Sequence, residues 1–432
     1  MSSVPSFLEG VYIGLNAVPD SRLILDAPVG CNFKSERVGM NHDFYSTLFH
    51  PLGLHRVITT VEHPQQLVSG TLDTLREKAA RIMELSRPSV LFISEVTALW
   101  LEGNEVEVIA RDLTEDLGIP VVYVKPDILE GDFLDGYETL LSRLAEVLPL
   151  EPSDAWPEPG VVGIVGYMPD RMEADHRANV AVLRDLVRAA GLEPGPVLLD
   201  GSDVDGLAEV ARASILLELP LSGGCAGALA ARTGARVIPM GLPVGLDGTS
   251  KWLNDLAEAA GSPEEADRYA RTRLGELVPT LDRVREMYLQ DRNLAIAAPP
   301  DLLPGLLALV DDLGMECSLV AARCRDPRRI VPVRDVMDKL GNDTEILVDY
   351  TRSRFRQALK KAHDEKPVTL VIGSTSEAMA AREVGAGLLE VGYPSYMTHA
   401  LTSRPLLGFD GTARLVEELV NAVLRQDFTQ GF

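Results

Sequence analysis

Cysteine and aromatic residues are scarce in this chain of 432 residues. It contains 4 cysteines, and 5% of its residues are Phe, Trp or Tyr. Because Ala, Leu, Val and Gly dominate instead, the composition favours helices packed on sheets over an aromatic-rich β-sandwich. The cysteines show no C-x-x-C spacing. In a reducing compartment we therefore expect free thiols or metal ligands rather than disulfides.

Positive charge is also in deficit. The chain has 41 Lys and Arg against 64 Asp and Glu, which gives a net charge of −23 and a pI near 4.7. The densest basic run, RCRDPRR at residues 323–329, is interrupted by an aspartate. Since such a charge repels nucleic acid and anionic lipid, we expect neither nucleic-acid nor membrane partners.

Long hydrophobic runs are missing as well. No window approaches the roughly 20 apolar residues that cross a bilayer. The first residues, MSSVPSFLEGVYIGLNAVPDS, lack the charged start and continuous apolar stretch of a signal peptide. These observations predict a cytoplasmic protein.

Several common catalytic motifs are absent from the sequence. There is no G-x-x-x-x-G-K-[ST], no strand followed by G-x-G-x-x-G, no G-x-S-x-G and no H-E-x-x-H. Their absence removes most of the support for a hydrolase, a dehydrogenase or a zinc protease. We also expect no ATP site in this chain.

Short apolar runs with helical patterns between them are what the sequence does contain. Runs that are apolar on both faces are typical of strands in a parallel sheet. We expect twelve such strands, at Leu23–Leu25, Arg56–Thr60, Ser89–Ile93, Pro120–Val124, Val161–Val165, Ile215–Glu218, Arg236–Ile238, Leu294–Ala297, Ser318–Ala321, Glu345–Val348, Thr369–Ile372 and Leu388–Val391. The pattern predicts an α/β fold with parallel sheets flanked by helices.

Two segments divide the chain into candidate domains. Residues 148–160, LPLEPSDAWPEPG, contain four prolines and no periodicity, which is typical of a linker. A long charged helix over about 263–291 leads directly into the next strand. We therefore predict three α/β domains, at residues 1–155, 156–290 and 291–432.

Cys31 is the first residue that could carry chemistry. It follows a predicted strand and a Pro-Val-Gly turn, and ligands of parallel α/β sheets lie beyond the carboxyl ends of the strands. Gly30 would let backbone approach closely, and a thiolate at position 31 could bind iron. A small buried structural cysteine is the alternative.

Histidines and a second cysteine offer further candidates. His42, His50, His55 and His63 lie within 22 residues, which is compatible with a metal site or with ordinary hydrogen-bonded histidines. Cys225 follows a strand and opens a predicted helix after two glycines. That position suits an anion or a thiolate, and equally a tightly packed turn.

Four stretches of the chain resemble the nitrogenase component 1 superfamily, which includes the dark-operative protochlorophyllide and chlorophyllide reductases. They are LDAPVGCNFKSERVG (25–39), HRVITTVEHPQQLVSGTLDTLREKAARI (55–82), VVGIVGYMPD (161–170) and the segment 368–424, VTLVIGSTSEAM to VEELVNAVL. The last stretch is the most specific of the four.

The resemblance implies three Rossmann-like domains around a central cleft and an iron–sulfur cluster of the 4Fe-4S type near a subunit interface. It places Cys31 as the first cluster ligand. Since this chain lacks the family's other cluster cysteines and a typical cluster needs four ligands, the remainder are expected from a homologous component 1-type subunit. Cys225 lies near the position of the nitrogenase cofactor cysteine.

The leading hypothesis is therefore an oxidoreductase subunit that works in a homo- or hetero-oligomer. It would take electrons from an ATP-dependent iron protein and reduce an unsaturated organic substrate such as a tetrapyrrole, with His42, His63 and Asp43 as candidate proton donors. A scaffold for metallocofactor assembly or a structural partner subunit is the first alternative. A small-molecule binding protein is the second.

Overall fold

The computed structural model describes residues 3–49, 55–61, 71–100, 105–127, 130–150, 156–261 and 263–430. The chain divides into two compact units. We call Pro5–Met172 together with Gly195–Pro239 the N-unit. The C-unit consists of Met1–Val4, Glu173–Pro194 and Met240–Phe432.

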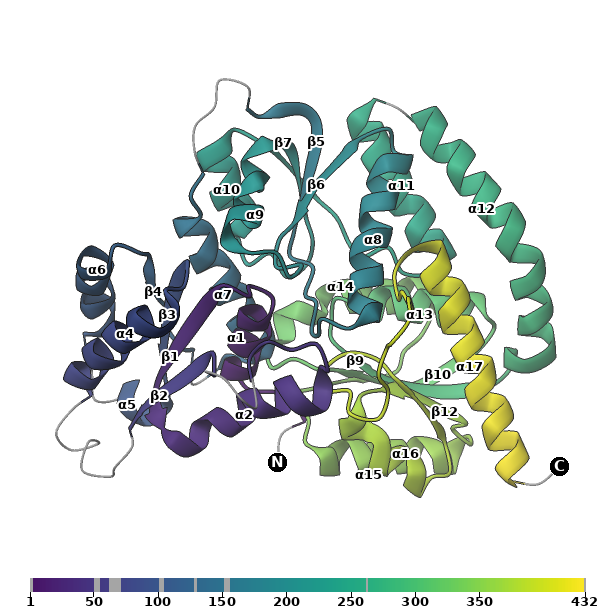
Figure 1. Cartoon of the computed structure of the whole chain (residues 1–432). Coiled ribbons are helices and arrows are strands. Elements are labelled where there is room, and N and C mark those ends of the chain that lie inside the picture. Colours follow the sequence, from purple (N-terminus) through teal and green to yellow (C-terminus); the bar gives the residue numbers. More distant parts are fainter. Residues whose placement is uncertain are drawn as a thin grey trace. The chain divides into compact units, whose positions relative to one another are not determined.

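The first sheet lies in the N-unit and has four parallel strands in the order β2-β1-β3-β4 (Figure 1). The strands are β1 Ser21–Pro28, β2 Val57–Val61, β3 Val90–Glu95 and β4 Val121–Tyr123. The helical segments are α1 Phe7–Asn16, η1 Val29–Asn32, α2 Phe33–Glu36, η2 Arg37–His42, α4 Leu72–Ser86, α5 Thr97–Trp100, α6 Val106–Leu117 and α7 Phe133–Val147.

Helices α4 and α6 cover one face of this sheet (Figure 1). Their buried residues Leu75 and Ile109 pack with Ile24 of β1 and Ile93 of β3 in one apolar cluster. The strands are apolar on both faces because helices cover both, which explains the continuous hydrophobic runs in the sequence.

The pair α1 and α7 is packed unusually closely. A Cβ on Gly10 would lie 1.7 Å from the carbonyl oxygen of Phe133, and a Cβ on Gly136 would lie 1.9 Å from that of Phe7. The two glycines thus let the two backbones touch. Since α1 leads into β1 and packs against the segment after it, this crossing positions the residues around Cys31.

Gly10→Ala should therefore destabilise the N-unit despite the better helix propensity of alanine. Displacing a backbone carbonyl costs about 1–3 kcal/mol, more than the roughly 1 kcal/mol that alanine gains over glycine in a helix. Gly227→Ala is the matched control, because a Cβ there would meet nothing within 4 Å. Thermal unfolding should show a lower Tm for Gly10→Ala and an equal or higher Tm for Gly227→Ala. Equal Tm values for Gly10→Ala and the parent would contradict this packing.

The second sheet has the order β6-β5-β7-β8. Its strands are β5 Glu158–Val165, β6 Glu193–Val197, β7 Ala213–Glu218 and β8 Arg236–Pro239. The neighbouring helical segments in the chain are α8 Ala174–Ala189, α9 Val204–Ala208, η3 Glu209–Arg212 and α10 Cys225–Thr233. Helix α10 contacts β7, β8 and α7.

The third sheet lies in the C-unit and has the order β11-β10-β9-β12-β13. Its strands are β9 Asn293–Ala298, β10 Glu316–Ala322, β11 Ile346–Val348, β12 Leu370–Gly373 and β13 Gly387–Glu390. The helical segments are α11 Leu246–Ala260, α12 Pro263–Val284, η4 Arg285–Leu289, α13 Leu303–Asp312, η5 Pro327–Ile330, α14 Val331–Leu340, α15 Arg352–Glu365, η6 Thr375–Glu377, α16 Ala378–Glu383 and α17 Gly408–Gln430.

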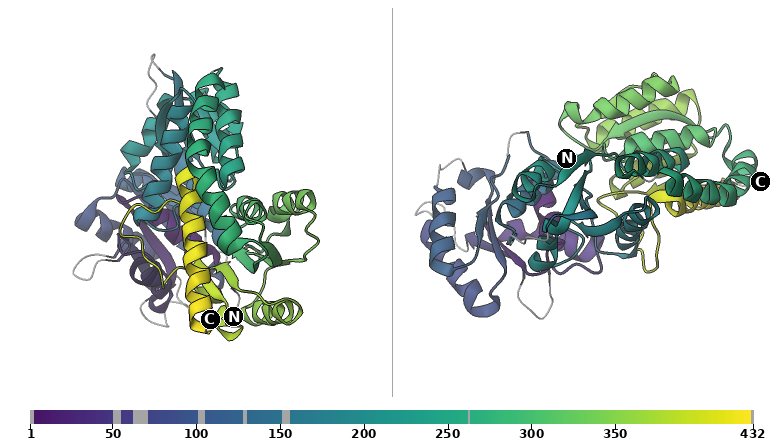
Figure 2. Two further views of the ribbon diagram at one scale, coloured as in Figure 1. Left: turned by 90° about the vertical axis from the view of Figure 1, so that its right-hand side faces the viewer. Right: turned by 90° about the horizontal axis from the view of Figure 1, so that it is seen from above.

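Helices cover both faces of the third sheet. Phe355 and Leu359 of α15 pack with Ala380 of α16 in a core cluster with β9 and β10, while α13 and α14 lie on the opposite face (Figure 1). The long helix α17 runs beside α12 (Figure 2), and Arg273 of α12 forms an ion pair with Asp410 of α17.

A buried ion pair closes the carboxyl edge of the third sheet. Arg323 follows β10 and donates to Glu377 Oε2 at 2.7 Å, and both side chains are at most 1% exposed. Tyr350, which follows β11, donates to Glu377 Oε1 at 3.1 Å. Arg323 also donates to the carbonyl oxygens of Ala297 and Tyr393 at 2.9 and 3.2 Å. Side chains from the ends of several strands thus fill the edge at which Rossmann-type sheets bind ligands.

The structure confirms the predicted fold class, α/β with three parallel sheets flanked by helices. Each of the twelve predicted strands overlaps an observed one. Strand β6 was missed because Glu193–Val197 reads EPGPV, and Pro and Gly are depleted in strands. Part of the predicted linker 148–160 is strand, because β5 begins at Glu158.

The predicted domain boundaries stay a prediction, as does the central cleft. The three sheets lie within the ranges 1–155, 156–290 and 291–432 respectively. Among the residues that the structure describes, no helix combines the length and the apolar character needed to cross a membrane.

Candidate functional site

Cys31 lies just beyond the carboxyl end of β1, where the chain leaves the strand at Pro28 and enters the single turn η1. Its side chain is half-buried, and Gly30 beside it is exposed. A Cβ on Gly30 would meet no atom within 4 Å, so packing within this chain does not require glycine at that position. The thiol therefore stands at an accessible point of the sheet edge.

One face of α1 supports the segment that carries Cys31. Glu9, Tyr12 and Asn16 are spaced i, i+3 and i+7 and so share a face. At the start of that face, Lys34 Nζ donates to Ser6 Oγ at 2.9 Å and lies 3.9 Å from Glu9 Oε2. Cys31 and the residues after it are thereby held along this helix.

The far end of the same face holds residues 43–47. Asn16 Nδ2 donates to Asp43 Oδ2 at 2.7 Å, and its Oδ1 accepts from Ser46 Oγ at 2.8 Å and from the Thr47 amide at 3.1 Å. Asn16 therefore uses both the nitrogen and the oxygen of its side-chain amide to hold the loop that follows η2.

Tyr12 lies between these two anchors and is fully buried, with an exposed fraction of 0%. Its hydroxyl has no hydrogen-bond partner among the residues that the structure describes. Burial raises the pKa of the phenol, and the nearby ionisable groups Cys31 and Glu9 raise it further. Since nearly all buried polar atoms in proteins are paired, this hydroxyl is one of several exceptions among the described residues.

The structure gives His42 and Asp43 defined partners within the N-unit. His42 Nε2 lies 3.0 Å from the carbonyl oxygen and 3.2 Å from Oδ1 of Asp170. The carboxylate of Asp43 accepts from Asn16, from the Tyr45 amide at 2.9 Å and from the Met172 amide at 2.9 Å. Both side chains are 0% exposed. These contacts support an anchoring role, and proton donation by either residue stays a prediction.

The other predicted histidines contribute little to the site. His63 and His50 lie outside the described residues. The ring of His55 stacks on that of Phe49, with centroids 4.4 Å apart, which is an ordinary packing contact. Within the described ranges, no group of three or more His, Cys, Asp or Glu side chains is arranged to hold a metal ion.

Cys225 opens α10 in the N-unit, on the other sheet from Cys31. Burial, with a smaller contribution from Glu218, raises the pKa of this thiol to about 12. A Cβ on Gly223 would lie 2.7 Å from that of Glu138, and Ser142 donates to the Gly223 carbonyl at 2.9 Å. The glycine turn is therefore packed against α7, and a cofactor role for Cys225 stays a prediction.

A buried acidic cluster at the same edge as Cys31 was not fully anticipated from the sequence. Glu95 ends β3 and is paired in register with Asp26, which lies two residues before the end of β1. Thr71 Oγ1 donates to Asp26 Oδ2 at 2.7 Å, Thr60 donates to the other oxygen, and the Tyr123 hydroxyl donates to Glu95. Burial and Glu95 raise the pKa of Tyr123. The sequence signal that could have pointed to these two carboxylates is their place near the carboxyl ends of predicted strands. Strands β1 and β3 flank the point where the strand order reverses, which is where such sheets bind ligands.

Exposed apolar side chains surround Cys31 in the chain. Val29, Phe33 and Met40 are 50%, 64% and 51% exposed. Phe44 and Tyr45 are also exposed. We call these five residues the apolar rim. Large apolar side chains gathered in one exposed segment are typical of a protein–protein contact.

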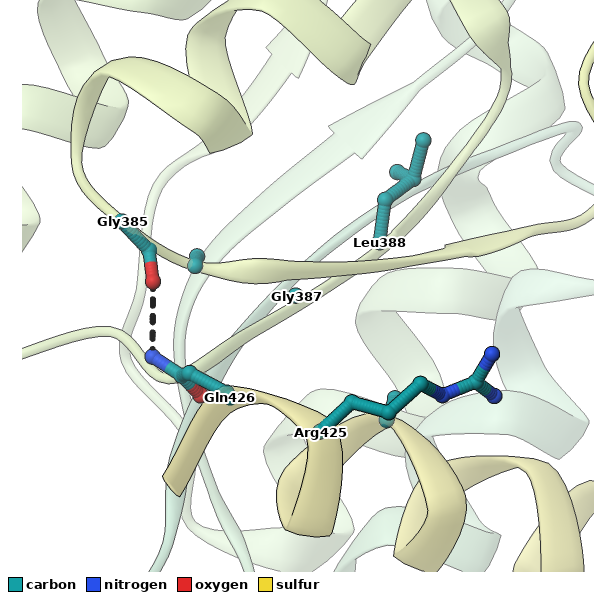
Figure 3. Close-up of a pocket in the computed structure, with 7 residues that line it drawn as sticks. Gly385, Gly387, Leu388, Arg425 and Gln426 are labelled. Carbon is teal, nitrogen blue, oxygen red and sulfur yellow. Dashed lines mark hydrogen bonds between the residues drawn. The ribbon is translucent and has the colours of Figure 1, made fainter. Parts of the chain in front are cut away.

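Two surface pockets lie in the C-unit and involve none of the predicted site residues. One, of about 300 Å³, lies between β13 and α17, where Gln426 Nε2 donates to the Gly385 carbonyl at 2.8 Å (Figure 3). The other lies between α8, α17 and the segment before α17, including Arg404 and Glu418, which form an ion pair. Helix and loop packing accounts for both.

Residues 8–424 match the family described as Nitrogenase component 1 type Oxidoreductase. The chain belongs to this family. The resemblance seen in the sequence is thereby confirmed.

Individual relatives are remote. The chain is 28% identical to a nitrogenase molybdenum-iron protein beta chain of Methanococcus maripaludis over 182 residues, which cover 42% of this chain and 38% of that protein. It is 24% identical to the corresponding chain of Frankia alni over 83% of this chain and 71% of the relative. It is 23% identical to the iron-molybdenum cofactor biosynthesis protein NifN of Bradyrhizobium diazoefficiens over 85% of this chain and 78% of that protein.

A solved structure shows the same fold. The chain called "Nitrogenase Cp1 at pH 6.5" superimposes with a TM-score of 0.81 at 16% identity, over 98% of this chain and 93% of that one. At such low identity the match establishes the architecture alone.

Proposed function

We propose that this chain is one subunit of a nitrogenase-like reductase and holds one side of an iron–sulfur cluster through Cys31. The observation that carries the proposal is the half-buried thiol at the sheet edge, within the apolar rim. Family membership supports it. When bound, a cluster of this kind supplies one-electron transfer.

The residues present fit one side of such a site. Cys31 offers a thiolate ligand, whereas a 4Fe-4S cluster takes four cysteines, and the next cysteine in the chain is Cys225. Gly30 leaves open space next to the thiol, which gives room for a second chain. A homologous component 1-type subunit seated on the apolar rim would supply the other ligands, so the active species would be a homo- or hetero-oligomer.

Electrons would come from an ATP-dependent iron protein, since this chain has no phosphate-loop motif of its own. An unsaturated organic substrate, such as a tetrapyrrole, would accept them. Asp26 and Glu95, buried at the edge that precedes Cys31, are further candidates for supplying protons, beside His42, His63 and Asp43.

A scaffold for metallocofactor assembly is the second candidate function, favoured by the similarity to the NifN biosynthesis protein. The two functions differ in what leaves the protein. A reductase turns over substrate repeatedly and keeps its cluster, whereas a scaffold transfers its metal group to an acceptor and is left without it. Incubating the iron-loaded oligomer with reductant, ATP and iron protein, and measuring protein-bound iron over time, separates the two.

Phe33→Asp tests the apolar rim as the partner contact. Burying a charge in place of an aromatic anchor costs about 2 kcal/mol or more, so binding of the co-expressed partner should weaken by about thirtyfold or more. Phe428→Asp is the matched control, because Phe428 is 76% exposed on α17 of the C-unit. Anaerobic co-purification should show loss of partner and iron for Phe33→Asp and retention of both for Phe428→Asp. Equal recovery from the two variants would contradict the assignment of this surface.

A further inference from the structure

Helix α15 concentrates positive charge on the surface of a chain whose net charge is −23. It lies beside α16 on one face of the third sheet (Figure 1), and its buried residues Phe355 and Leu359 pack into the core there. Residues 350–363 contain no Asp or Glu. The exposed side of the helix carries five cations, Arg352, Arg354, Arg356, Lys360 and Lys361. We call these five residues the basic face.

The basic face is only partly neutralised by carboxylates of its own chain. Arg356 and Lys361 form ion pairs, at 3.5 and 3.9 Å. On the exposed helix α12, by contrast, Arg271 is paired with Asp267 four residues before it. Within the described part of the chain, three members of the basic face have no carboxylate partner, namely Arg352, Arg354 and Lys360.

This arrangement of charges is unfavourable for the helix itself. Cations near the N-terminal end of a helix oppose its macrodipole, and the first turn of α15 contains Arg352 and Arg354 but no acidic residue. Arg352, Arg356 and Lys360 follow one another at intervals of four residues, and like charges at that spacing repel each other. The folding of α15 therefore does not account for its charges, which suit a partner outside the chain.

An exposed methionine adjoins the basic face. Glu383, the ion-pair partner of Arg356, lies one turn after Met379 in α16, so these two residues share a side of that helix. Met379 is 67% exposed. Since arginine and methionine are enriched at protein–protein interfaces, this composition is typical of a surface that contacts another protein.

The extent of the basic face limits which polyanion fits it. Between Arg352 and Lys361 the helix rises about 14 Å. Exposed carboxylates follow at both ends, with Asp349 before the helix and Asp364 and Glu365 at its end. A nucleic-acid duplex or a lipid bilayer carries negative charge over a greater length and would meet these carboxylates. A short acidic segment of a protein can match the positive stretch alone.

We propose that the basic face of α15 is a docking surface for an acidic segment of a partner protein. This inference goes beyond the proposed function and does not depend on a metal group at Cys31. Charge complementarity of this kind steers association and sets its salt dependence. The contact is therefore reversible and responds to ionic strength.

The test follows the binding of a short, fluorescently labelled poly-glutamate peptide to the full chain by anisotropy, at increasing concentrations of NaCl. The α15 variant combines Arg352→Gln, Arg356→Gln and Lys360→Gln. The matched α12 variant removes the same charge from three exposed arginines, through Arg268→Gln, Arg271→Gln and Arg283→Gln.

The parent chain should bind the peptide at low salt and lose affinity as salt screens the charges. The α15 variant should bind about tenfold more weakly and with less dependence on salt, whereas the α12 variant should match the parent. The Tm of the α15 variant should equal or exceed that of the parent, because repulsion along the helix is relieved. A lower Tm would show that these charges serve the fold and would overturn the inference.

Four other results would overturn it as well. They are no binding of the peptide by the parent at low salt, equal weakening in the two variants, tighter binding of a short DNA duplex or of phosphatidylserine vesicles than of the peptide, and self-association of the parent that is lost in the α15 variant. The last two would assign the basic face to another polyanion or to a second copy of this chain.

Discussion

Arg323→Met should lower the free energy of unfolding of the C-unit by about 3–5 kcal/mol, the usual cost of removing one partner of a buried ion pair. Arg323 and Glu377 are 0% and 1% exposed. Methionine would leave the Glu377 carboxylate buried with Tyr350 and Ser374 as its remaining donors, at 3.1 Å and at 2.8–2.9 Å. The carbonyls of Ala297 and Tyr393 would also lose a donor.

Urea unfolding followed by circular dichroism measures this loss of stability. Two further variants test whether the loss comes from the buried ion pair. Arg328→Met removes an arginine that is 88% exposed and paired with Asp326, so it should change stability by less than about 1 kcal/mol. Arg323→Met combined with Glu377→Gln removes both charges and should cost less than the sum of the single changes. An effect of Arg323→Met as small as that of Arg328→Met would contradict the buried pair.

Asp43→Ala should destabilise the N-unit by about 3 kcal/mol, because three donors, two of them in buried hydrogen bonds, lose a charged acceptor and each orphaned buried group costs about 1–3 kcal/mol. The donors are Asn16 Nδ2 and the amides of Tyr45 and Met172. Releasing this loop from α1 should also reduce iron binding at Cys31, although the thiol itself is unchanged.

Asp43→Asn separates anchoring from proton donation at the same residue. Asparagine keeps one carbonyl oxygen, which in the Oδ2 position can accept from Asn16 and from the Met172 amide while the Tyr45 amide loses its acceptor. An anchor should therefore retain more of the Tm and the iron in Asp43→Asn than in Asp43→Ala. An essential proton donor would instead lose turnover in Asp43→Asn with Tm and iron intact. Thermal unfolding, iron content and turnover of the two variants should be measured together. A Tm for Asp43→Ala within about 1 °C of the parent would contradict the anchoring role.

The sequence predicted the repeating architecture well because parallel strands covered on both faces are encoded locally. An apolar run such as Leu23–Leu25 needs no distant partner to be recognised. Strand β6 was not predicted from the sequence, because its pairing with β5 overrides the low strand propensity of Pro194, Gly195 and Pro196. Neighbouring strands, rather than local residues, decide that segment.

The candidate site was predictable in part for the same reason. Cys31 stood out because it follows a strand, and the family resemblance gave it a role. The contact of Glu95 with Tyr123 carries no local signal, because it depends on a strand that is distant in the sequence. The anchoring contacts of His42 and Asp43 involve Asp170 and Met172, more than 120 residues away, and pairing over such a distance cannot be inferred from a single sequence.

Iron analysis and EPR of the anaerobic, dithionite-reduced oligomer test the central proposal most directly. Cys31→Ala should abolish the cluster signal and most of the bound iron. Cys317→Ala, which changes a thiol within β10 of the C-unit whose pKa burial raises to about 12, should preserve both. Unchanged iron and an unchanged signal in Cys31→Ala would contradict the assignment of Cys31 as the cluster ligand of this subunit.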